Sequence, residues 1–117
     1  MTNIYDSAHE LARQLKETEE YREFKRLKEL AYEDSTNKAL LDEFKRLQFR
    51  LQAKAASGEK PDDEDTQKLM RISSLLQLNN DASSYLLAES RFQKLLAGIY
   101  KILGDVAGID IDALTQS

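Results

Sequence analysis

The 117-residue sequence contains no cysteine and no tryptophan, and it has only one proline, one histidine and four glycines. Without cysteine the chain has no disulfide, no thiolate zinc site, no cysteine-ligated iron–sulfur cluster and no thiol nucleophile. The scarcity of turn-forming residues argues against a β-sandwich or barrel, whose strands are separated by turn signals roughly every 8 to 12 residues. We therefore predict an all-α protein in which residues 1–117 form one domain around one core.

Long apolar runs and a strong charge of one sign are also absent. No stretch approaches the roughly 18 apolar residues of a membrane span, and the N-terminus carries no basic and apolar leader. Charged residues make up 32% of the chain, but the net charge is only −4. This balance argues against a protein that coats nucleic acid. We expect a cytoplasmic protein without a membrane span.

Apolar residues recur at the spacing of one helical face in five segments. A first helix is predicted over residues 4–16 after a possible cap at Asn3, and a second helix from the N-cap Thr18 to about Asp34. Ser35 and Thr36 are cap-type residues from which a third helix runs to about residue 56. The predicted core stripe of this third helix consists of Leu40, Phe44, Leu47 and Leu51.

The clearest break in the helical pattern is the segment Ser57-Gly58-Glu59-Lys60-Pro61. Glycine suits the position after a helix, and proline lacks the N–H that a continuing helix needs. Asp62 is then the predicted N-cap of a fourth helix, with Asp65 in the capping-box position. Residues 79–81 interrupt the path before a last helix over about residues 82–107.

The last predicted helix keeps a seven-residue apolar repeat for nearly four heptads. Its seam is formed by Tyr85, Ala88, Phe92, Leu95, Leu96, Ile99, Ile102, Leu103 and Val106. This stripe is wider than the seam of a two-stranded coiled coil and requires more than one neighbour. The helix would be roughly 39 Å long, which exceeds what a globule of about 13 to 14 Å radius of gyration encloses. We therefore predict an elongated bundle of about five helices that forms a homodimer through this helix and the third; the alternative is the core helix of a monomer.

Three apolar residues lie off the predicted stripes of their helices. Phe49 points well over 90° away from the stripe of the third helix, and Met70 and Leu78 lie similarly off the stripe of the fourth. An exposed apolar patch of sufficient size marks an interface. The candidate protein interface therefore comprises Phe49, Met70, Leu78, Phe92, Leu96, Ile99 and Leu103.

Residues arranged for catalysis or for metal binding are hard to find in this sequence. His9 is the only histidine, and it lacks a Ser/Asp constellation or metal-ligand spacing. The pair Asp42-Glu43 is followed at helical spacing by Lys45 and Arg46, which indicates surface ion pairing. The acids at 62–65 lie in a first helical turn, where the helix dipole explains them. We predict no catalytic residue, no metal and no cofactor, and hence no enzyme.

Two other functions need different residues. An RNA-associated protein would use Arg46, Arg50 and Lys54, which repeat at i, i+4 and i+8 beside Phe49. Nucleic acid remains the less favoured partner because glutamates alternate with the other basic cluster, on the second helix. A small-molecule binder would need a buried polar anchor, for which Tyr85 and Lys28 are the candidates.

Several short motifs together resemble a known family. The N-terminus reads Asn3-Ile4-Tyr5-Asp6, followed by Leu11, Leu15 and Tyr21-Arg22-Glu23-Phe24. Further matches in order are Asp42-Glu43-Phe44, Gln52, Gly58-Glu59-Lys60-Pro61, Asn79, Ala88-Glu89, Phe92, Ile99 and Ile102. Across essentially the whole chain, this order is similar to the YheA-type branch of the YlbF/YmcA family, small helical proteins of Gram-positive bacteria.

The resemblance implies an all-helical, elongated fold that often dimerises, and it implies no catalytic residue. The best-known members act with a third protein in a complex that influences ribonuclease Y-dependent RNA maturation, competence, sporulation and biofilm formation. Those members carry cysteines that bind iron–sulfur clusters. This sequence has no cysteine, so the cluster chemistry does not carry over. The expected function is that of a regulatory or adaptor protein acting through protein–protein contacts, with a protein partner in a regulatory complex.

Overall fold

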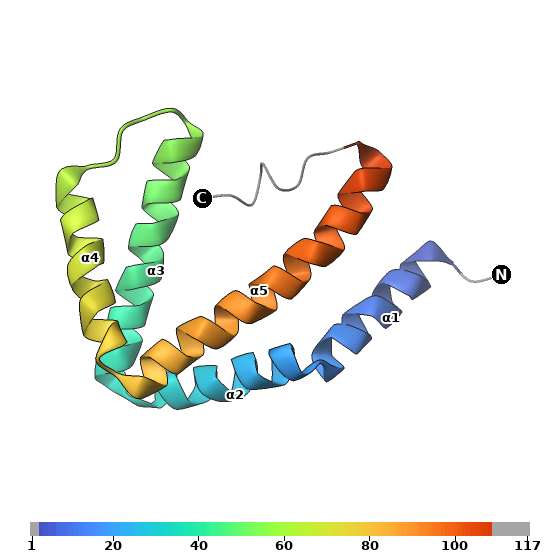
Figure 1. Ribbon diagram of the computed structural model, residues 1–117, viewed down its shortest axis with the longest axis horizontal. Coiled ribbons are helices and arrows are strands. Elements are labelled where there is room, and N and C mark those ends of the chain that lie inside the picture. The colour runs from blue at the N-terminus through green and yellow to red at the C-terminus, as the bar shows by residue number, and fades with distance from the viewer. Residues whose placement is uncertain (1–2, 109–117) are drawn as a thin grey trace.

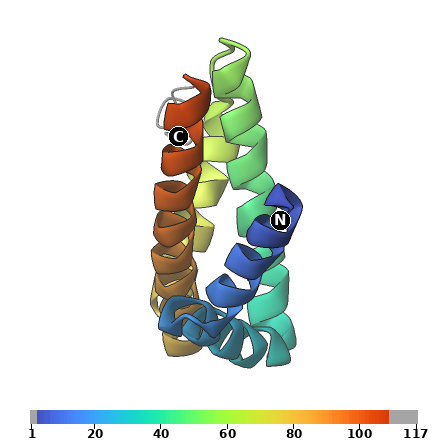
Figure 2. The ribbon, with the colours of Figure 1, turned by 90° about the vertical axis from the view of Figure 1, so that its right-hand side faces the viewer.

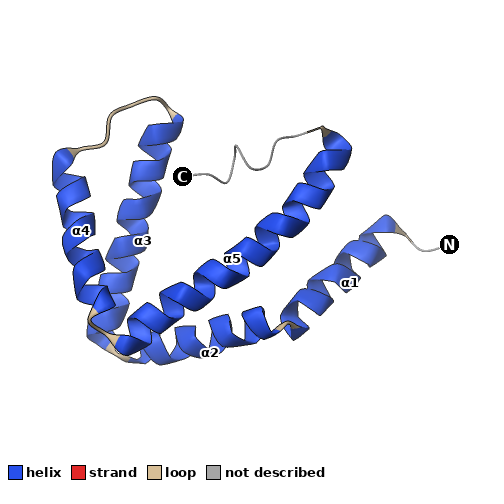
Figure 3. Ribbon diagram, viewed as in Figure 1, coloured by secondary structure: helices blue, strands red, loops and turns tan. Residues whose placement is uncertain are grey.

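A computed structural model of the chain describes residues 3–108 and contains five α-helices and no strand in that range (Figure 3). Residues 1–2 and 109–117 of the predicted domain lie outside the described residues. The helices are α1 (Ile4–Glu17), α2 (Glu19–Glu33), α3 (Ser35–Ala56), α4 (Asp63–Gln77) and α5 (Asn80–Ala107). The predicted all-α class and the long C-terminal helix are confirmed.

Two of the five helix starts, those of α1 and α2, are held by the side chains that the sequence indicates. The Asn3 side chain accepts a hydrogen bond from the Tyr5 N–H at 2.9 Å, and Thr18 Oγ1 accepts from the Tyr21 N–H at 3.2 Å. The third helix differs from the expectation, because Asp34, and not Ser35 or Thr36, is its N-cap. An ionised carboxylate caps two amides at once, those of Thr36 and Asn37.

The predicted capping box of the fourth helix is wrong. Asp62 occupies the N-cap position of α4, but its side chain makes no capping hydrogen bond. Instead, Asp62 Oδ2 accepts from Lys54 Nζ on α3 at 2.7 Å. Asp65 is buried and pairs with Arg50, also on α3, at 3.2 Å. Both carboxylates therefore join α4 to α3, because a cationic partner on the neighbouring helix outcompetes a local amide.

The helices form two arms that diverge from a common corner (Figures 1 and 2). In one arm α3 and α4 form an antiparallel hairpin, and its turn uses Gly58 at φ +75°. In the other arm α5 runs antiparallel to α2, and α1 continues from α2 at an angle. The molecule measures 54 × 37 × 15 Å with a radius of gyration of 17.1 Å, against about 13 Å for a compact chain of this length. The fold is therefore elongated and open.

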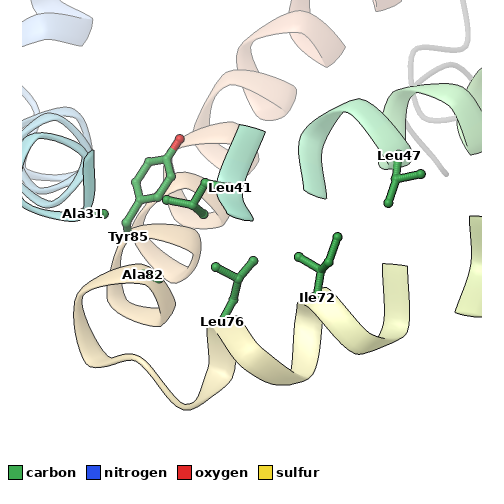
Figure 4. Packing of buried hydrophobic residues seen from close by; sticks show 7 residues of the cluster. All are labelled: Ala31, Leu41, Leu47, Ile72, Leu76, Ala82 and Tyr85. Atoms are coloured by element: carbon green, nitrogen blue, oxygen red, sulfur yellow. The ribbon is translucent and has the colours of Figure 1, made fainter. Parts of the chain in front are cut away.

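The hydrophobic core lies at the corner where α2, α3, α4 and α5 meet (Figure 4). It consists of the buried residues Ala31, Leu41, Leu47, Ile72, Leu76, Ala82 and Tyr85. Leu41 was not expected in it; Leu40 and Phe44 of the predicted stripe are only partly buried. The apolar face of α3 is wider than one stripe because α3 packs against α4 in its own arm and against α2 of the other arm.

A polar contact also closes the corner. Asn37 is buried in the first turn of α3, and its Nδ2 donates to Oδ1 of Asn79 at 3.2 Å. The same Asn79 oxygen accepts from the Ala82 N–H at 2.9 Å and so caps α5. One asparagine therefore sets both the start of α5 and its position against α3.

Candidate interaction surface

Tyr85 is the most buried polar side chain between the arms, as the sequence suggested for a buried anchor. Its hydroxyl donates to Glu89 Oε2 at 2.7 Å and accepts from Lys45 Nζ, which lies 4.8 Å from the ring centroid. Burial, together with the neighbouring Glu89 carboxylate, raises the pKa of the Tyr85 hydroxyl well above its ordinary value. The phenol stays protonated and serves as a structural link between α3 and α5.

An aromatic cluster joins α2 to the first half of α5. The Phe92 ring stacks on Phe24 with centroids 5.3 Å apart and meets Tyr21 edge-on at 5.5 Å. The centroid of the Tyr85 ring lies 6.0 Å from that of Phe24 and 5.7 Å from that of Tyr32. Such pairs contribute beyond their buried area. Phe92, one of the predicted interface residues, is therefore half-buried within its own chain.

Phe49 lies on the side of α3 that faces α5 and is 74% exposed. It borders a hollow of about 520 Å³ between the two arms. The other residues lining this hollow are Phe44, Lys45, Gln48, Gln52, Leu86, Glu89, Ser90 and Gln93. The sequence analysis missed the glutamines because, on single helices, they look like ordinary surface residues; only the approach of α5 to α3 brings them together.

Met70 and Leu78 lie on α4 and are exposed. Neither borders the hollow that Phe49 lines. At 100° per residue, both side chains point away from the Ile72 and Leu76 positions that face α3. The structure therefore places Phe49 and the two α4 residues on different faces.

Exposure rises along the apolar seam of α5. Tyr85 and Ala88 are buried, and the predicted interface residues Leu96 and Ile99 are half-buried. Beyond them the seam is open: Leu103 is 57% and Val106 89% exposed. The first half of the seam is covered by α2, whereas no helix among residues 3–108 covers the second half to a comparable extent.

The three basic residues of the RNA hypothesis each have an acidic partner. Arg46 pairs with Glu43 at 2.5 Å, Arg50 with Asp65 at 3.2 Å and Lys54 with Asp62 at 2.7 Å. Hydrogen bonds from Arg46 and Lys68 lower the pKa of Glu43 to about 2. Lys54 likewise holds the pKa of Asp62 below its ordinary value. The positive field of this face is therefore largely neutralised.

Groups that could bind a metal were also sought in the structure. Among residues 3–108, no cluster of three or more histidine, aspartate or glutamate side chains is arranged to hold an ion. His9 lies exposed on α1. None of the described helices is long and apolar enough to cross a membrane.

Comparisons with known proteins relate this chain to several others. A family model described as "Control of competence regulator ComK, YlbF/YmcA" matches residues 4–106. A UPF0342 protein of Caldicellulosiruptor bescii is 39% identical over 105 residues, covering 90% of this chain and 88% of that protein. A UPF0342 protein of Clostridium tetani is 35% identical over 109 residues, covering 93% and 94%.

One solved structure shares the same fold. It is a protein of unknown function (DUF964) from Bacillus stearothermophilus, with a TM-score of 0.73 and 18% sequence identity. The match covers 90% of this chain and 92% of that chain. The open arrangement of helices is therefore found in a second protein.

Proposed function

The chain belongs to the YlbF/YmcA family, and we propose that it is a non-enzymatic regulatory or adaptor protein that acts through helix-mediated protein–protein contacts. The observation that carries this proposal is the amount of apolar surface left open on an ordered helical frame. Ile102, Leu103 and Val106 lie within 100° of one another on the last turns of α5 and are each more than 50% exposed, and Phe49 borders the hollow at 74% exposure. Soluble monomers rarely leave extended apolar surface uncovered, so such surface indicates contact with another protein.

The engagement of the ionisable side chains supports a non-enzymatic role. The Tyr85 hydroxyl is held by Lys45 and Glu89, and Asp62 and Asp65 are paired with Lys54 and Arg50 of α3. Catalytic groups are instead poised to exchange protons with a substrate. The described charges therefore serve to hold helices together.

We further propose that the protein is a cytoplasmic homodimer and that it takes part in RNA processing or developmental regulation, as the family resemblance implies. The family description, control of a competence regulator, supports a regulatory role. Sedimentation velocity at micromolar concentration tests the dimer. We expect a species of twice 13.4 kDa; a monomer that is unchanged by concentration would overturn the dimer.

The partner is tested by capture of the tagged protein from its native host. We expect a defined protein that remains bound in 0.5 M salt and after ribonuclease treatment, because apolar contacts are insensitive to salt. Binding should be lost in Phe49→Asp and kept in the matched variant Ala55→Asp, an exposed α3 position that does not line the hollow. Recovery of RNA that falls steeply with salt, and that is lost in Arg50→Gln, would instead establish the RNA-associated alternative.

A further inference from the structure

We propose that the homodimer forms at one end of the molecule, where α1 of each copy packs on the exposed half of α5 of the other. We call this end the open end and define it as residues 4–17 of α1 and residues 94–107, the second half of α5. Two open ends would then form a four-helix arrangement around a two-fold axis. The inference rests on the homodimer proposed above and identifies its contact surface.

The apolar repeat of α5 continues beyond the segment that α2 covers. Val106 is 89% exposed although it keeps the seven-residue register of the buried Tyr85, and Ile102 is 67% exposed although it keeps that of the buried Ala88. Side chains in one register face one direction along a helix. The surface that binds α2 over the first half of α5 therefore extends, unoccupied, over the second half.

Among the five helices, α1 has the strongest separation of apolar and polar faces. Its apolar stripe is Ile4, Ala8, Leu11 and Leu15, and none of its residues is buried. Ile4 is 79% exposed. A helix of 14 residues is marginal in water without tertiary contacts. The structure thus contains a helix that needs an apolar partner and, at the same end, an apolar face that lacks one.

The chain itself does not bring these two faces together. Thr18 is extended at ψ 151° and ends α1 while it caps α2, so the two helices are not collinear. The turned view shows α1 diverging from the C-terminal half of α5 (Figure 2). A two-fold dimer solves this problem because an isologous interface pairs the same patch on both copies.

The charges favour α1 against α5 over α5 against α5. Residues 4–17 hold three acidic and two basic residues, whereas residues 94–107 hold two basic residues and one acidic residue. Two α5 ends in direct contact would bring together net charges of the same sign. The α1 of a second copy brings the opposite sign, which favours this pairing.

The absence of cysteine makes a cross-linking test specific, since each introduced thiol is unique. Leu11→Cys in one copy and Leu103→Cys in a differently tagged copy are mixed by unfolding and refolding, then treated with a short bis-maleimide. We expect a cross-linked product that carries both tags. The matched control combines Leu11→Cys with Leu78→Cys, an exposed apolar position on α4, and should give little product.

The outcomes separate this inference from the dimer itself. A dimer in sedimentation that cross-links only through Leu78 or Phe49 thiols would overturn the open-end contact and leave the homodimer standing. A monomer would overturn both. A chain carrying both Leu11→Cys and Leu103→Cys that cross-links only within itself would show that α1 closes on its own α5, and would also overturn the inference.

Charge substitution gives a second measurement that does not depend on thiol geometry. Ile102→Glu should raise the dimer dissociation constant at least about tenfold, because it places a carboxylate in the apolar contact. Leu78 is also exposed but lies at the C-terminal end of α4. Leu78→Glu should therefore leave the dimer dissociation constant unchanged. Equal effects of the two variants, with helicity retained by circular dichroism, would contradict the open-end contact.

Discussion

Lys45 on α3 and Glu89 on α5 form an ion pair across the two arms, with Nζ and Oε2 2.6 Å apart. The two residues are 44 positions apart in the sequence. The same lysine donates to the hydroxyl of Tyr85, whose ring is buried at the corner. Charge-assisted hydrogen bonds of this kind are the strong ones. This contact ties α3 to α5 beside the hydrophobic core.

The contribution of this ion pair can be measured directly. Lys45→Met should lower the free energy of unfolding by about 1–2 kcal/mol. This is less than the largest contributions of hydrogen bonds to charged groups, because the lysine side chain is one-third exposed. A double-mutant cycle with Glu89→Gln, followed by urea unfolding at fixed protein concentration, isolates the pair. Additive effects of the two substitutions would show that the arms are not coupled through it.

Two adjacent leucines on α4 test the position of the core. Leu76 is 1% exposed and Leu75 is 53% exposed. Leu76→Ala should cost about 2–4 kcal/mol, since it removes buried methyl groups and leaves a cavity. Leu75→Ala should cost clearly less. Comparable losses for the two, measured by thermal or urea unfolding, would contradict the packing of α4 on α3.

The starts of α3 and α4 should respond differently to loss of their N-cap carboxylates. Asp34→Ala should cost about 1 kcal/mol or more, because it leaves the Thr36 and Asn37 amides without an acceptor. Asp34→Asn, which still accepts a hydrogen bond, should recover most of the loss. Asp62→Ala should cost less than Asp34→Ala, since Asp62 caps no amide. The reverse order would contradict this assignment of the caps.

Acid sensitivity should be traceable to Glu43. Its pKa is lowered in the folded protein from 4.5 to about 2 by Arg46 and Lys68. A carboxylate with a lowered folded pKa stabilises the fold above its unfolded pKa, and this contribution is lost as the pH falls toward the folded pKa. The stability difference between wild type and Glu43→Gln should therefore be largest above about pH 5 and vanish near pH 2. Urea unfolding of both proteins at a series of pH values measures this difference, and a difference that stays constant with pH would contradict the role of Glu43.

Much of this protein follows from local patterns, as two particular cases show. Thr18 was predicted as an N-cap from its residue type and the acids after it, and the structure confirms it. Leu47 was predicted in the core from the spacing of apolar residues on α3, and it is fully buried. In both cases the deciding interactions lie within a few residues of one another, and helical geometry fixes them.

The features that were mispredicted depend on residues far apart in the chain. Asp62 and Asp65 have the spacing of a capping box, but Lys54 and Arg50 on the neighbouring helix take their side chains. The hollow bordered by Phe49 exists only because α5 approaches α3 at an angle. Spacing along one helix cannot report which side chain of another helix competes for the same atom.

Local patterns in the sequence specify the five helices, the N-caps of α1 and α2, the absence of thiol chemistry and the wide apolar stripe of the last helix. The physical reason is that helical period and capping are local, and the residues that set them lie within one or two turns. The packing of helices far apart in the sequence is what places α2 over the first half of that stripe. It also leaves Ile102 and Val106 in the second half exposed. Burial depends on which helix arrives at a face, and the break at Thr18 directs α1 away from it.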